Sequence, residues 1–77
     1  MTVTIAGMED KIAREFVTWL KKEWITPKID VGEFGWNISF VATKEMKIGF
    51  DEDCISIDTK YDGIDIEKAD FVTVEIQ

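Results

Sequence analysis

Histidine is absent from this 77-residue chain, and cysteine occurs only once. Without histidine, the Ser-His-Asp and Cys-His catalytic arrangements and the usual zinc ligand sets are excluded. The lone Cys54 cannot form a disulfide within the chain, so a disulfide-stapled secreted scaffold is excluded unless the thiol pairs between chains. We therefore expect a reducing compartment, a structural role for Cys54 in a strand, and no metal or cofactor.

Long apolar runs are also missing. No stretch approaches the roughly 20 apolar residues of a membrane span, and residues 1–10 carry neither early positive charges nor an apolar run of signal-peptide length. These absences predict a cytoplasmic protein without a membrane partner. Hydrophobic residues make up 45% of the chain and charged residues 32%, which is typical of a globular protein. At this length we expect one small domain covering residues 1–77.

Leucine, asparagine and glutamine each occur once, whereas isoleucine occurs eleven times. Few amides together with many Glu and Lys residues are common in hyperthermophile proteins, which favours a thermophilic source. An AT-rich genome would explain the isoleucines equally well. A melting temperature below about 65 °C would count against the thermophilic hypothesis.

Apolar residues repeat at helical spacing between residues 8 and 25. Ile12, Phe16, Leu20 and Trp24 lie four apart and form one face of a predicted helix. Acidic residues stand in its first turn and lysines in its last, as the helix dipole favours, and Pro27 prevents continuation.

The rest of the chain alternates as strands do. Residues 2–6 predict a first strand, residues 26–33 a connecting loop, and the remainder a meander with a two-residue turn at Asp62-Gly63. The expected strands are 34–43, 46–50, 54–61, a short return through Ile64 and Ile66, and 71–76. The predicted fold is therefore α+β, with one amphipathic helix packed on one face of an antiparallel sheet of four to five strands, in the order β-α-β-β-β-β.

Carboxylates are numerous, but none forms a recognisable catalytic or metal-binding pattern. With sixteen acidic residues, accidental pairs are expected, so Asp51, Glu52 and Asp53 are interpreted as a solvated hairpin end rather than an acid/base pair. Residues 58–69 superficially resemble a calcium loop, but Lys60 stands at the third position and Ala69 at the twelfth, where oxygen ligands belong. Weak calcium binding at the acidic turns is left open as an alternative.

Charge is distributed unevenly along the chain. Residues 1–28 hold five basic and four acidic residues, net +1, whereas residues 29–77 hold four basic and twelve acidic residues, net −8. Lys11 and Arg14 lie on the solvent side of the predicted helix, where a solvated face is the simplest interpretation. Nucleic-acid binding is not the main expectation, because a protein of net charge −7 lacks the basic footprint that this requires, but binding through the basic face of the helix is left open as a further alternative.

The tryptophans are interpreted mainly as core residues. Trp19 and Trp24 lie where the helical stripe ends or borders the polar face, and aromatic residues in such places are favoured at protein interfaces. The candidate interface residues are Trp19, Trp24, Lys11, Arg14, Asp51, Glu52 and Asp53.

The absence of a catalytic constellation favours a non-enzymatic module. Because one helix can cover only one face of a sheet, we expect self-association or a protein partner at an exposed strand edge or at the second sheet face. The alternative is an acidic inhibitor that mimics nucleic acid, with its carboxylates in place of phosphates. The carboxylates in question belong to Asp51, Glu52, Asp53, Asp58, Asp62, Asp65 and Asp70.

Overall fold

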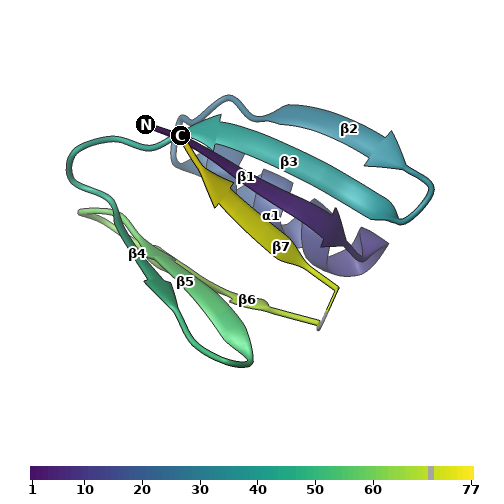
Figure 1. Cartoon of the computed structure of the whole chain (residues 1–77). Coiled ribbons are helices and arrows are strands. Elements are labelled where there is room, and N and C mark those ends of the chain that lie inside the picture. Colours follow the sequence, from purple (N-terminus) through teal and green to yellow (C-terminus); the bar gives the residue numbers. More distant parts are fainter. Residues whose placement is uncertain (70) are drawn as a thin grey trace.

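A computed structural model describes residues 1–69 and 71–77 as seven strands and one helix (Figure 1). The elements are β1 (Thr2–Met8), α1 (Asp10–Lys22), β2 (Lys28–Gly32), β3 (Gly35–Val41), β4 (Lys47–Phe50), β5 (Cys54–Asp58), β6 (Gly63–Glu67) and β7 (Thr73–Ile76). The α+β class and the single helix are as expected. The helix is shorter than the expected span of residues 8–25, because β1 continues to Met8 and the chain turns after Lys22.

The strands form two antiparallel sheets instead of one meander. The first sheet has four strands in the order β2-β3-β1-β7, and the second has three in the order β4-β5-β6. The prediction of one sheet of four to five strands is therefore only partly correct. The chain leaves the first sheet after β3 and returns to it only with β7, which pairs with β1.

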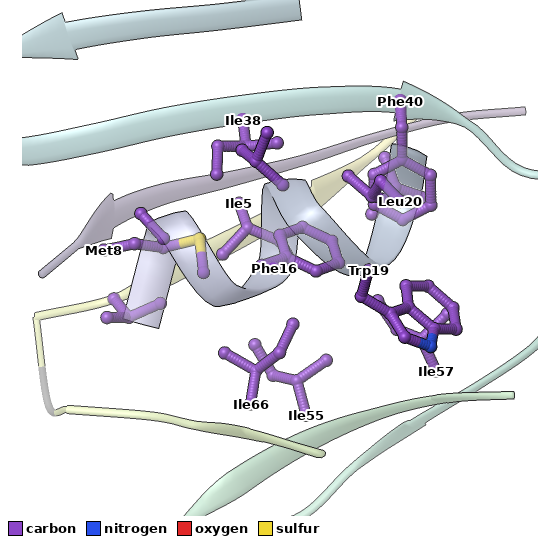
Figure 2. Packing of buried hydrophobic residues seen from close by; sticks show 14 of the residues in the cluster. Ile5, Met8, Phe16, Trp19, Leu20, Ile38, Phe40, Ile55, Ile57 and Ile66 are labelled. Atoms are coloured by element: carbon purple, nitrogen blue, oxygen red, sulfur yellow. The ribbon is translucent and has the colours of Figure 1, made fainter. Parts of the chain in front are cut away.

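The helix lies between the two sheets and joins them into one core. Figure 2 shows Phe16, Leu20 and Trp19 of α1 between the side chains of β1 and β3 on one side and the isoleucines of β5 and β6 on the other. Because both faces of the helix meet a sheet, its stripe is wide. The buried residues are Val3, Ile5, Met8, Ala13, Phe16, Val17, Trp19, Leu20, Ile38, Phe40, Ala42, Ile55, Ile57, Ile66 and Val72.

Two local predictions were wrong. The segment expected to be a loop over residues 26–33 contains β2, whose five residues pair with β3. The turn expected at Asp62-Gly63 is longer, because Asp58 pairs directly with Gly63 and the loop between β5 and β6 covers residues 59–62. The Thr59 hydroxyl organises that loop by accepting hydrogen bonds from the backbone N–H groups of Tyr61 and Asp62 at 3.2 and 3.1 Å.

The helix ends in a Schellman motif that has tryptophan where glycine is usual. The Ile25 N–H donates to the Leu20 carbonyl at 2.9 Å, and the Trp24 N–H donates to the Lys21 carbonyl at 3.1 Å. Trp24 has a φ of 62°, in the left-handed region, and its side chain is 94% exposed. The backbone thus adopts an unfavourable conformation at a residue that contributes almost nothing to the core.

Candidate protein interface

Strand β2 forms an edge of the four-stranded sheet, and all five of its residues are exposed. Ile29 and Val31 lie opposite Ile38 and Trp36 of β3, so they share the sheet face that carries the core. The helix packs chiefly against β3 and β6 rather than against β2. Ile29 and Val31 therefore remain 40% and 62% exposed, so this edge carries apolar side chains that residues 1–69 and 71–77 cover only in part.

The backbone of β2 also has free hydrogen-bonding groups. Just beyond the end of β3, the Ala42 N–H donates to the Met1 carbonyl at 2.9 Å, so by alternation Phe40 and Ile38 are β3 positions that bond to β1. The alternate residues Ser39 and Asn37 bond to β2, where their partners are Lys28 and Asp30. The N–H and C=O groups of Ile29 and Val31 consequently point away from the sheet and can pair with another strand. We call residues Lys28–Gly32 with these outward groups the β2 edge.

A fixed polar cluster adjoins the β2 edge on the core-facing side of the sheet. Asp10 accepts a hydrogen bond from Arg14 Nε at 2.9 Å and one from Trp36 Nε1 at 3.2 Å. The Arg14 guanidinium lies over the Trp36 ring, 5.2 Å from its centroid. Since Trp36 is the cross-strand neighbour of Val31, the cluster holds the side chains beside the edge in place.

The residues predicted as interface candidates are not brought together. Trp19 is buried in the core, whereas Lys11 and Arg14 are exposed near the start of the helix. Trp24 follows the other end of the helix, about 20 Å from Lys11 at a rise of 1.5 Å per residue. The acidic turn of Asp51, Glu52 and Asp53 belongs to the second sheet. Of this set, Arg14 lies beside Trp36, next to the β2 edge.

Acidic residues are concentrated in the three-stranded sheet and in the turns that connect its strands. Residues 47–67 hold seven acidic residues and two lysines, net −5. Partial burial, followed by the carboxylates of Asp51, Asp65 and Asp53, raises the pKa of the Cys54 thiol above its usual 9.0. This environment disfavours the thiolate and hence a nucleophilic role for Cys54.

Asp62 lies at the other end of this sheet, in the β5–β6 loop. A hydrogen bond from the Gly63 N–H and another from Lys22 Nζ at 3.3 Å lower the pKa of its carboxyl group. Asp62 therefore ties the β5–β6 loop to the last turn of the helix. Asp70, the remaining member of the predicted acidic set, lies outside the described residues.

No known protein family, curated protein or solved structure matches this chain. Within residues 1–69 and 71–77 there is no group of three or more Cys, Asp or Glu side chains arranged to hold a metal ion. In the same residues no helix is long and apolar enough to cross a membrane.

The sequence did not predict the β2 edge as a strand, because a turn-forming residue stands at each end of it. Pro27 and Gly32 are turn formers, and together they led residues 26–33 to be interpreted as a loop. The alternation of Lys28, Ile29, Asp30 and Val31 was the signal for a strand with one apolar and one polar face.

Proposed function

We propose that the protein is a small non-enzymatic interaction module of the cytoplasm that binds a protein strand at the β2 edge. The observation that carries this proposal is that Ile29 and Val31 combine outward backbone groups with apolar side chains that are 40% and 62% exposed. A strand added at this edge gains main-chain hydrogen bonds from the outward backbone groups and apolar contact from the two side chains. This mode of recognition is known as β-augmentation.

The test uses the tagged protein as bait in lysate, with nuclease treatment, and compares it with two variants. Val31→Pro removes an outward N–H that makes no bond within the sheet, so the fold should survive while pairing is blocked. Val31→Thr keeps that N–H and the shape of the side chain. Recovery of the same partner, or of the protein itself, by the wild type and Val31→Thr but not by Val31→Pro supports the proposal. Equal recovery by all three contradicts it.

The second candidate function is an acidic inhibitor that mimics nucleic acid. It is favoured by one observation, the concentration of net charge −5 in residues 47–67. A partner bound there should be a nucleic-acid-binding protein, released steeply as salt rises. The same pull-down at increasing salt separates the two candidates, because a partner held by main-chain bonds and apolar side chains should remain bound, whatever the nuclease treatment.

A further inference from the structure

We propose that the strand bound at the β2 edge is β2 of a second copy of this chain, paired antiparallel about a twofold axis at Ile29. This inference rests on the proposed function, because it names the occupant of the same edge. The pairing would join two four-stranded sheets into one continuous sheet of eight strands.

Backbone geometry restricts the registers to a few. Within β2, only Ile29 and Val31 direct both N–H and C=O groups outward, so these residues must occupy the hydrogen-bonded positions in both copies. With Ile29 on the axis, the two Ile29 residues exchange two bonds, and each Val31 N–H reaches the Pro27 carbonyl of the other copy. With Asp30 on the axis, Ile29 and Val31 pair reciprocally. Both registers give four hydrogen bonds, so the backbone alone does not choose between them.

The charges of Lys28 and Asp30 favour one of these registers. Lys28 and Asp30 alternate with the apolar residues and lie on the outer face of the sheet. With Ile29 on the axis, each Lys28 lies opposite Asp30 of the other copy, which gives two ion pairs in the close, non-hydrogen-bonded positions. With Asp30 on the axis, the two Asp30 carboxylates face each other. Placing Val31 on the axis leaves Asp30 opposite Gly32 and forms no ion pair. The segment Lys28-Ile29-Asp30 is thus complementary to itself in one register.

The distribution of charge over the molecule also favours this edge over β7. In Figure 1, β2 lies on the side of the four-stranded sheet remote from β4, β5 and β6, which carry much of the negative charge. A second copy at β2 therefore keeps the two acidic sheets apart. The β7 edge instead borders the second sheet, with Phe50 of β4 beside Val74 and Ile76. Pairing β7 with itself by reciprocal bonds between these two residues would also set Glu75 against Glu75.

The contact is small, because it joins two strands of five residues. Interfaces below about 1,200 Å² are weak or transient, so we expect half-dissociation at roughly 0.1–1 mM. Sedimentation equilibrium of the purified chain at 0.15 M salt, from 20 µM to 2 mM, measures this directly. Amide hydrogen exchange over the same range should show Ile29 and Val31 becoming protected as concentration rises.

Charge reversal tests the register. Lys28→Asp leaves aspartate at both outer-face positions, and Asp30→Lys leaves lysine at both, so each variant alone sets like charges opposite each other. We expect each to dimerise about tenfold more weakly than the wild type or worse, and an equimolar mixture to recover wild-type affinity as a heterodimer. With Asp30 on the axis, Lys28→Asp would be almost neutral because Lys28 faces Gly32, and that result overturns the proposed register.

Two further outcomes would overturn the proposal. A chain that stays monomeric at 2 mM does not use its own β2 as partner. A dimer in which the Ile29 and Val31 amides still exchange freely uses another surface. In either case the proposed function is judged separately, by whether Val31→Pro abolishes capture of a different protein while Val31→Thr retains it.

Discussion

Replacing Trp24 by glycine should make the protein more stable. Trp24 occupies the left-handed position of the Schellman motif, with a φ of 62°, and its 94% exposure leaves little packing to lose. A left-handed conformation costs a non-glycine residue about 1–2 kcal/mol. Glycine gains more freedom in the unfolded chain, which offsets about 0.5–1 kcal/mol of that relief. The net expectation is about 0.5–1 kcal/mol of added stability, or about 2–8 °C in Tm for a domain of this size.

Trp24→Ala is the matched control for this prediction. Alanine removes the ring but keeps the unfavourable φ, so its free energy of unfolding should stay close to that of the wild type. Urea denaturation followed by circular dichroism measures all three proteins on the same scale. If Trp24→Gly is no more stable than Trp24→Ala, the position does not hold a positive φ in solution. If both variants are clearly less stable than the wild type, the Trp24 ring stabilises the folded protein despite its exposure, and the reasoning fails.

The remaining predictions concern the core and two titrating groups. Phe16→Ala should cost about 3–5 kcal/mol, or at least about 12 °C in Tm, because Phe16 is fully buried, whereas Phe34→Ala should stay within about 0.5 kcal/mol because Phe34 is 84% exposed. Asp62 has a lowered pKa when folded, so it stabilises the protein above its unfolded value of 3.8, and the stability gap between wild type and Asp62→Asn should close as pH falls below that value; urea midpoints at a series of pH values measure the gap. The Cys54 thiol, with a pKa raised above 9.0, should react with iodoacetamide at pH 8.5 more slowly than glutathione does, and Asp51→Asn should accelerate it.

Local periodicity predicted most elements but not their assembly. The helix followed from the spacing of Ile12, Phe16 and Leu20, and the strand alternation located β3 to β6 because side chains alternate between faces every residue. Which strands pair is a question of long-range contact. Nothing in the alternation of residues 46–61 distinguishes a continuation of the first sheet from a second sheet on the other side of the helix. The width of the helical stripe, which includes Ala13 and Val17, was the available signal that both faces of the helix are covered.

The sequence predicted the kind of candidate interface but not its position in the chain. An exposed strand edge was expected, but its location depended on recognising residues 26–33 as a strand. Of the two tryptophans at the border of the helical stripe, Trp19 meets the second sheet and is buried, while Trp24 extends into solvent beyond the helix. Burial of a single side chain depends on which elements pack over it, and the helical pattern alone does not contain that information.

The alternating charges of β2 serve two purposes at once. Edge strands are commonly protected from uncontrolled pairing by charged residues and proline, and β2 has Lys28, Asp30 and, just before it, Pro27. In the proposed dimer, these charges oppose a register centred on Asp30 and favour the one centred on Ile29, so they would select a partner rather than exclude every partner. Because that pairing uses the outward groups of both copies, the β2 edge is consumed when two chains have joined. Further growth of that eight-stranded sheet would need the β7 edge, where reciprocal pairing of Val74 and Ile76 would set Glu75 against Glu75.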